Sequence, residues 1–190
     1  MNVSALNSLE ELERLYREEA LPPTPVVEAR ARWIGTSLGI ADVPLLVGEG
    51  DIEEIIETPS VVPVPGTKPW VMGVAAHMGG LLPIISGDVF FRKRPYQGRV
   101  RDWCMVIRRG GFHFGMTLSA VERDLKFPVE QRDMTAPVDP DFAPFTDGGF
   151  HHRDRFLAVL DTDRLVADSD LADASAPVPQ TSEETSNDQD

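Results

Sequence analysis

The chain has 190 residues, which suits one domain with short tails, and 42% of them are hydrophobic, enough to build a core. Its formal net charge is -13, from 31 acidic and 18 basic side chains, and seven of the acids fall between Asp168 and Asp190. This balance argues against a general affinity for nucleic acids or anionic lipids, because both are polyanions.

The first 30 residues are predicted to form an amphipathic helix followed by a Pro-rich linker. Leucines recur in steps of three at Leu6, Leu9, Leu12 and Leu15, a spacing typical of one helix face. The prolines within residues 21–30 then end the helix. The pattern leaves open whether this helix packs on the body of the protein or binds a partner. Acidic residues stand where a secretory signal would carry basic ones, so a cytoplasmic location is expected.

From residue 31 to about residue 123, the sequence predicts short strands separated by Gly and Pro. Strands of this length and spacing are typical of an all-β barrel or sandwich. Gly110-Gly111 is expected to join two of them as a tight hairpin. The apolar runs are Trp33–Leu38, Val43–Val47, Val61–Val64, Val71–Ala75, Leu81–Ile85, Cys104–Ile107 and Phe112–Leu118.

The C-terminal part is predicted to hold a loop, one more strand and a short helix. Residues 137–149 are rich in Pro, Phe156–Leu160 is an apolar run, and Asp161–Ala167 begins with acids that suit a helix start. The polar, acidic residues 172–190 are expected to be a disordered tail. One domain is therefore predicted over residues 31–171.

No catalytic motif, metal motif or cofactor site is recognisable in the sequence. His77, His113, His151 and His152 lack the short spacings of a zinc site, and His151 and His152 would point to opposite faces of a strand. Cys104 lies in an apolar run, which predicts a buried structural thiol. A metal-binding β-barrel enzyme that uses His151, His152 and Cys104 is the less favoured alternative.

Two stretches bear on contacts with membranes and other macromolecules. Val71–Ile85 is the longest apolar stretch, but Gly and Pro interrupt it and it is shorter than the roughly 20 residues of a membrane helix, so no direct membrane insertion is expected. Arg92–Arg94, Arg99 and Arg101 form the only basic cluster. A solvated connecting loop is its simplest explanation, and a docking patch for an acidic protein surface is the alternative. RNA binding, as by an oligonucleotide-binding barrel, comes third in so acidic a chain.

The segment Ile52–Gly87 resembles the CheW family. It reads IEEIIETPSVVPVPGTKPWVMGVAAHMGGLLPIISG, which is similar to the family pattern of a Glu-Ile pair, a Pro-containing turn and a stretch of the form GVxNxRGxxxPxxDL. Phe114-Gly115 and Phe156–Leu165 resemble later parts of the family pattern. Leu125–Gln131 and Pro144–Leu160 are similar in sequence to proteins of the pilus-associated, PilI-type branch.

The resemblance implies a mostly β fold of two five-stranded, SH3-like barrels around a shared core, with an extra N-terminal helix. It implies a non-enzymatic adaptor without cofactors that couples the cytoplasmic tip of a methyl-accepting chemoreceptor to a CheA-like histidine kinase, in the control of type IV pilus twitching motility. Carried over position by position, the partner contacts would be Glu54, Val74, Ala76, Met78 and Gly79. For Val74 taken alone, a place in the core is the simpler explanation.

Several positions depart from the family pattern. Ala76, Met78 and Ser86 stand where the family has Asn, Arg and Asp, and Ser119 stands in for a further Asp. Met78 supplies apolar contact but no charge, so it cannot pair with a carboxylate. These departures favour, as an alternative function, a divergent scaffold for a signalling assembly that contains no chemoreceptor.

Overall fold

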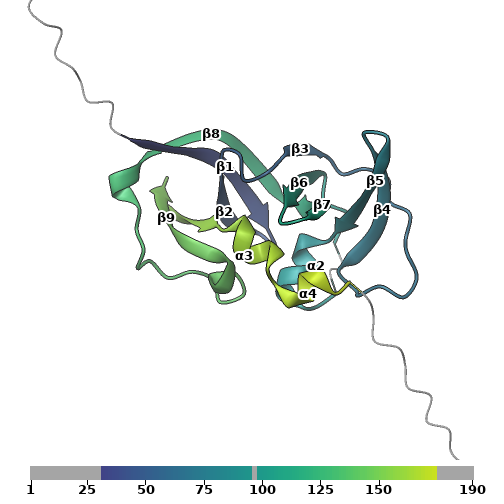
Figure 1. Ribbon diagram of the computed structural model, residues 1–190. Helices are drawn as coiled ribbons and strands as arrows, with labels where there is room; N and C mark the ends of the chain where they lie inside the picture. Colours follow the sequence, from purple (N-terminus) through teal and green to yellow (C-terminus); the bar gives the residue numbers. More distant parts are fainter. Residues whose placement is uncertain (1–30, 96–97, 175–190) are drawn as a thin grey trace, which may run out of the picture. The chain divides into compact units, whose positions relative to one another are not determined.

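A computed structural model describes residues 31–95 and 98–174 (Figure 1). The helix predicted within residues 1–30 and the tail residues 175–190 lie outside the described residues, and the domain boundaries stay predictions. In chain order the elements are β1 (Arg32–Ile40), β2 (Val43–Gly48), β3 (Glu54–Glu57), β4 (Val71–His77), β5 (Gly80–Ile85), α2 (Gly87–Arg92), β6 (Trp103–Arg109), β7 (Phe112–Leu118), β8 (Ala120–Pro128), η1 (Val129–Gln131), η2 (Ala143–Phe145), β9 (Thr146–His152), β10 (Arg155–Leu160), α3 (Thr162–Val166) and α4 (Ser169–Ala172).

The strands form two five-stranded sheets. Sheet A has the order β8-β1-β2-β10-β9, and sheet B has the order β3-β6-β7-β5-β4. Neighbours pair antiparallel except β10 with β2 and β5 with β7, which are parallel. All of sheet B lies in the chain between β2 and β8, so the chain leaves sheet A, builds sheet B and returns (Figure 1). The predicted mostly β fold with two five-stranded units is confirmed.

Neither sheet closes into a barrel through strand pairing among the described residues. Side chains nevertheless join the two edge strands of each sheet. In sheet A the rings of Phe127 on β8 and Phe150 on β9 stack with centroids 4.7 Å apart. In sheet B the carboxylate of Glu54 on β3 lies 2.8 Å from the imidazole of His77 on β4. Each sheet is therefore curled like an SH3 barrel, while its hydrogen-bonded ladder stays open.

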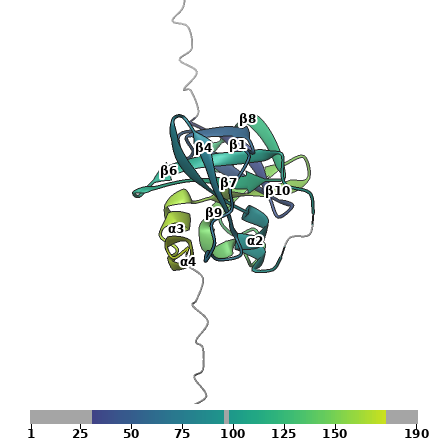
Figure 2. The same ribbon diagram turned by 90° about the vertical axis from the view of Figure 1, so that its right-hand side faces the viewer.

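A shared core joins the two sheets, as the resemblance implied. One buried cluster contains Leu38 and Leu160 of sheet A, Ile107 and Met116 of sheet B, and Phe90 of α2. Smaller buried clusters lie within each sheet, around Phe127 and Phe150 in sheet A and around Leu82 and Cys104 in sheet B. Helices α2, α3 and α4 gather on one side of the strands and contribute buried side chains to the shared core (Figures 1 and 2).

The strand predictions hold for most apolar runs and fail at one. Residues 61–64 form no strand; only Val62 pairs, as an isolated bridge to Val74 of β4. The predicted loop 137–149 is also too long, because β9 begins at Thr146. The predicted short helix after the last strand is confirmed, since the Asp161 side chain accepts a hydrogen bond from the backbone N–H of Arg164 and caps α3.

Four two-residue turns connect antiparallel neighbours, and both central residues of each turn have positive φ. This is the type I′ hairpin turn, whose twist matches that of the flanking strands. The predicted Gly110-Gly111 turn between β6 and β7 is one of them. The four turns are Ala41-Asp42, Met78-Gly79, Gly110-Gly111 and Arg153-Asp154.

Candidate partner-binding surface

The β4–β5 hairpin of sheet B has one buried and one outward side. Ala75, Leu82 and Ile84 point inward and are at most 2% exposed. Their neighbours alternate to the other side, where Ala76 pairs with Leu81 and Val74 with Pro83. The outward side therefore carries apolar residues where an exposed sheet surface would ordinarily carry polar ones.

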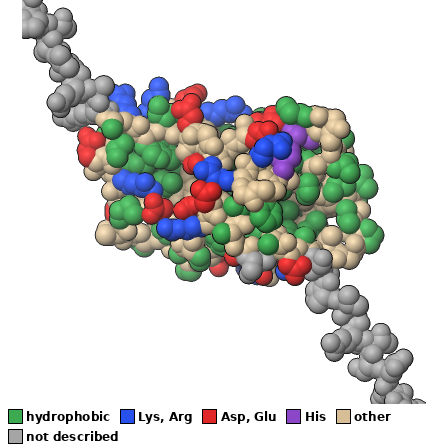
Figure 3. Space-filling view, viewed as in Figure 1, with side chains coloured by type: hydrophobic (Ala, Val, Ile, Leu, Met, Phe, Trp, Pro, Cys, Tyr) green, Lys and Arg blue, Asp and Glu red, His purple; other side chains and the backbone are tan. Residues whose placement is uncertain are grey.

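Several of these outward side chains are strongly exposed. Met78 is 82% exposed, Leu81 is 72% exposed, and Val62, which lies beside Val74, is 67% exposed. Figure 3, which has the same orientation as Figure 1, shows apolar side chains along the end of the molecule that contains β4 and β5. We call this surface the hairpin face and define it as Val62, Val74, Ala76, Met78, Leu81 and Pro83.

Four of the five candidate contact residues lie on this hairpin. Val74 and Ala76 are on its outward side, and Met78 and Gly79 form its turn. Val74 is half-buried rather than part of the core. Glu54 is not on the hairpin: it lies on β3, at the opposite edge of sheet B, and reaches the hairpin only through His77.

A polar cluster supports the inner side of the hairpin tip. Glu54 Oε1 and His77 Nε2 lie 2.8 Å apart, although the contact is not aligned as a hydrogen bond. Next to them, Glu53 contacts both Arg108, at 3.1 Å, and His113, at 3.2 Å. The rings of His77 and His113 have centroids 6.4 Å apart. These contacts link the tip of the β4–β5 hairpin to β3 and to the β6–β7 hairpin.

The turn at Met78-Gly79 holds a methionine in an unfavourable backbone conformation. Met78 has φ of 45° and Gly79 has φ of 78°, both in the left-handed region. Glycine adopts this region freely, whereas for methionine it costs about 1 kcal/mol or more. The chain thus places a large apolar side chain at the most exposed point of the hairpin despite backbone strain.

The departures at Ser86 and Ser119 lie away from the hairpin face. The Ser86 side chain is 9% exposed and accepts a hydrogen bond from the backbone N–H of Val89, which caps α2. The backbone N–H of Ser119 donates to the carbonyl of Gly39 at 2.7 Å, where the chain passes from sheet B to sheet A. Ser86 therefore does not mark a change in the exposed surface.

The predicted basic cluster is not a simple solvated loop. Arg92 belongs to α2 and contacts Asp139 at 2.9 Å and Asp141 at 2.6 Å. Arg101 contacts the buried carboxylate of Asp88 at 2.7 Å. Acidic side chains thus neutralise most of the positive charges of the cluster. The resulting ion pairs hold α2 and the loop that follows it against the body of the domain.

The residues proposed for a metal-binding enzyme are not brought together. Cys104 is buried on β6 of sheet B, where burial raises the pKa of its thiol to about 12, and the predicted structural thiol is thereby supported. His151 lies on β9 of sheet A, 3.2 Å from Asp133. Within residues 31–95 and 98–174, no three His, Cys, Asp or Glu side chains are placed to hold a metal ion. The same residues contain no helix long and apolar enough to span a membrane.

Comparison with known proteins gives the family. Residues 38–170 match the CheW-like domain. The chain is 27% identical over 131 residues to the protein PilI of Pseudomonas aeruginosa, which covers 68% of this chain and 74% of PilI. The fold matches the crystal structure of the scaffolding protein TtCheW from Thermoanaerobacter tengcongensis with a TM-score of 0.58 and 16% identity, over 68% of this chain and 89% of TtCheW. This chain therefore belongs to the CheW-like domain family.

Proposed function

We propose that this chain is a cytoplasmic, non-enzymatic chemosensory adaptor that couples a methyl-accepting chemoreceptor to a CheA-type histidine kinase and so controls twitching by type IV pili. The observation that carries the proposal is the hairpin face, a strongly exposed apolar surface on a β-hairpin of a CheW-like domain. The similarity of the chain to PilI supports the assignment to the pilus system.

The hairpin face has the chemistry of a protein-docking site. Contiguous exposed apolar side chains mark interaction surfaces, and methionine adapts its shape to a partner better than branched residues do. Apolar side chains on a firmly held element suit docking against the apolar stripe of a helix, such as one of a receptor's helical hairpin. Because Met78 carries no charge, the partner surface opposite it is expected to lack a buried acid.

The five candidate residues have different parts in this proposal. Val74, Ala76 and Met78 contact the partner directly, and Gly79 permits the turn that presents Met78. Glu54 acts from behind the face, because its contact with His77 holds the hairpin tip against β3.

Coupling requires more than binding. An adaptor transmits a receptor's state only if it contacts the receptor–kinase complex differently in the kinase-on and kinase-off states. A stiff hairpin suits this task, because a small movement of its partner changes the contacts made by Met78 and Leu81 rather than being absorbed by bending of the hairpin.

Equilibrium binding tests the proposal. We expect Leu81→Asp to weaken binding to the cognate receptor's cytoplasmic tip or to the regulatory domain of the kinase by about tenfold or more, which is 1.4 kcal/mol or more, because a charge would be buried in an apolar interface. The matched control is Val129→Asp in η1, which makes the same apolar-to-acid change at another exposed position, away from the hairpin face, and should bind like the unaltered chain. Equal binding by the Leu81→Asp protein would remove the hairpin face from the interface.

One alternative function has a specific observation behind it. The uncharged Met78 at the hairpin tip also suits a scaffold for a signalling assembly without a chemoreceptor. A pull-down with the cognate receptor tip separates the two functions. Capture of the receptor tip supports the adaptor, whereas capture of non-chemosensory partners alone would favour the scaffold.

A further inference from the structure

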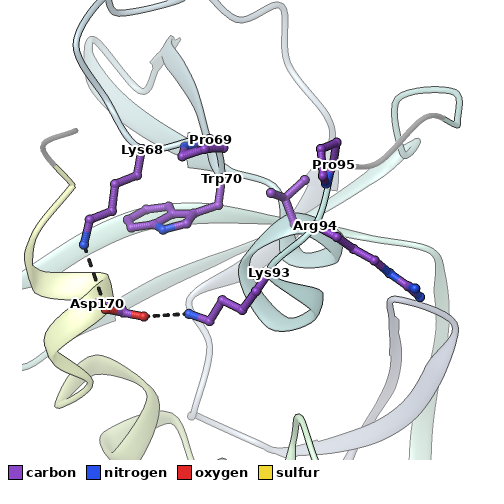
Figure 4. Close-up of a pocket in the computed structure, with 8 residues that line it drawn as sticks. Lys68, Pro69, Trp70, Lys93, Arg94, Pro95 and Asp170 are labelled. Carbon is purple, nitrogen blue, oxygen red and sulfur yellow. Dashed lines mark hydrogen bonds and ion pairs between the residues drawn. The ribbon is translucent and has the colours of Figure 1, made fainter. Parts of the chain in front are cut away.

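A hollow lies away from the hairpin face, between the loop before β4, helix α2 and helix α4. Its volume is about 300 Å³. Trp70 and Val89 supply apolar surface, and Lys68, Lys93 and Arg94 supply three positive charges to its lining (Figure 4). In a chain of net charge -13, this concentration of cations around an apolar surface is unusual and points to an anionic occupant.

Acids of the chain itself contact the cations of this hollow: Asp170 lines it, and Asp173 lies 3.7 Å from Lys68 Nζ. Asp170 of α4 lies between two ammonium groups, 2.7 Å from Lys93 Nζ and 3.9 Å from Lys68 Nζ, beside the indole ring of Trp70 (Figure 4). The hydrogen bond from Lys93 holds the pKa of Asp170 below its usual value, so it is ionised at neutral pH. The neighbouring Leu171 is 6% exposed and anchors α4 in the shared core.

This internal contact is well placed but weak. The side chains of Lys93 and Asp170 are each 55% exposed, and ion pairs in contact with water contribute little to stability. Arg94 points away from Asp170 and makes no ion pair with any residue of the described ranges (Figure 4). The hollow therefore has a carboxylate site that can be vacated at little cost and a further cation without an acidic contact.

We propose that this hollow binds an acidic segment of a partner protein, whose carboxylate takes the place of Asp170 between Lys68 and Lys93. An apolar side chain of the same segment would then lie against Pro69, Pro95 and Val89, over the edge of Trp70, which is 6% exposed. Asp170 acts as an internal competitor, which lowers the affinity for any segment that offers a single acid. This site is separate from the hairpin face and does not depend on the function proposed for it.

A protein segment fits the hollow better than a nucleic acid does. The surface between the cations is made of Trp70, Val89 and two prolines, which offers apolar contact that a phosphate backbone does not use. A second hollow of about 210 Å³ shares Pro69 and Val89 with the first, so an extended chain can continue into it. The negative charge of the rest of the chain opposes polyanions.

The test is a nuclear magnetic resonance titration of the full-length chain, with a blocked peptide that carries residues 168–174 of this protein as the probe. The indole N–H signal of Trp70 reports binding, and those of Trp33 and Trp103 serve as internal controls. If Asp170 occupies the site about nine-tenths of the time, Asp170→Asn should lower the peptide's dissociation constant about tenfold. Lys93→Ala, added to that variant, should abolish the shift of Trp70.

Matched controls decide between the explanations. Asp168→Asn makes the same change of charge in the same segment and keeps a capping side chain for α4, so it should leave peptide binding as in the unaltered chain. The same peptide with Asp170→Asn should not bind. Unchanged binding in the Asp170→Asn protein would overturn the proposal. So would an equal shift of Trp70 with inorganic phosphate or single-stranded RNA in place of the peptide.

The chain's own C-terminal acids are the remaining possible occupant. Changing Glu183, Glu184, Asp188 and Asp190 to amides in the full-length protein tests them. If that variant, and not Asp170→Asn, binds the peptide more tightly, the site belongs to the chain's own tail and a partner segment is ruled out. If only Asp170→Asn does so, the partner proposal stands.

Discussion

The β4–β5 and β6–β7 hairpins of sheet B share one backbone design and carry opposite surfaces. Both close through two-residue turns with positive φ at each central residue. Around the Gly110-Gly111 turn, polar side chains are held in ion pairs: Arg108 with Glu53, and Arg109 with Asp163 and Asp51. Around the Met78-Gly79 turn the outward side chains are apolar.

The difference agrees with the docking role proposed for the β4–β5 hairpin. The β6–β7 hairpin uses glycine where the turn needs it and satisfies its exposed charges, so both choices favour stability. The β4–β5 hairpin accepts a strained methionine and leaves Met78 and Leu81 in water, and both choices cost stability. Backbone strain also occurs in the Ala41-Asp42 and Arg153-Asp154 turns, so it is the exposed apolar side chains that favour a surface kept for contact with another molecule.

The largest expected contrast is in core packing. Ile107 of β6 is fully buried in the shared core, whereas Leu81 of β5 is 72% exposed. Ile107→Ala should lower the free energy of unfolding by about 2–5 kcal/mol, while Leu81→Ala should change it by no more than about 0.5 kcal/mol. Urea unfolding measures both. A large loss in Leu81→Ala would mean that the hairpin face is part of the folding core.

A smaller contrast is expected in the two turns. Gly111 has φ of 83° and open space where a side chain would begin, so Gly111→Ala should cost about 1 kcal/mol from backbone strain alone. Met78→Asn should instead stabilise the protein by about 0.5 to 1 kcal/mol, because asparagine tolerates this conformation. Thermal or urea unfolding checks both signs. Destabilisation by Met78→Asn would contradict the strain assigned to this turn.

Met78→Arg separates stability from binding at one position. It restores the charge found in the family pattern at a site that is 82% exposed. We expect a change in the free energy of unfolding within about 0.5 kcal/mol together with a changed affinity for the partner. Unfolding and partner titrations on the same preparation provide the measurement. If the variant unfolds, Met78 belongs to the core and the contact assignment is wrong.

The smallest expected effect is a difference in the rate of alkylation between two thiols. Cys104 on β6 has a pKa of about 12 because it is buried, so it should resist alkylation by iodoacetamide at pH 8. In Met78→Cys the new thiol is exposed and should react at the rate of an ordinary cysteine. Mass spectrometry over time measures both sites in the same molecule. Rapid reaction at Cys104 in the folded protein would show that β6 opens readily.

Much of this fold follows from the sequence, because most strands are apolar runs bounded by Gly and Pro. Three strands were missed, β3, β8 and β9, each for a physical reason. In β3 only two apolar residues stand between two acids. In β8, charged side chains dominate and only Phe127 is buried. In β9, the pair Gly148-Gly149 suggests a turn, yet Gly149 lies in the strand. The strand needs glycine at this position because a side chain there would collide with the backbone oxygen of Leu157 on β10.

The candidate site was predicted in part. The family motif pointed to Val74, Ala76 and Met78, but it gave no reason to include Leu81 or Val62. Leu81 could have been found from the alternation along its strand. Leu82 and Ile84 are two residues apart and share the buried face, so Leu81, next to Leu82, must lie on the opposite, outward face. Val62 could not, because only its isolated bridge to Val74 brings it to the surface of the hairpin, and such long-range pairing leaves no local pattern.

Receptor-dependent kinase activity tests the central claim most directly. The measurement is the rate of phosphoryl transfer by the cognate CheA-type kinase, reconstituted with receptor and with either the unaltered chain, Leu81→Asp or the control Val129→Asp. The account predicts that Leu81→Asp abolishes the receptor's control of the kinase while Val129→Asp preserves it. Full control by the Leu81→Asp protein would contradict the claim that the β4–β5 hairpin carries the coupling contact.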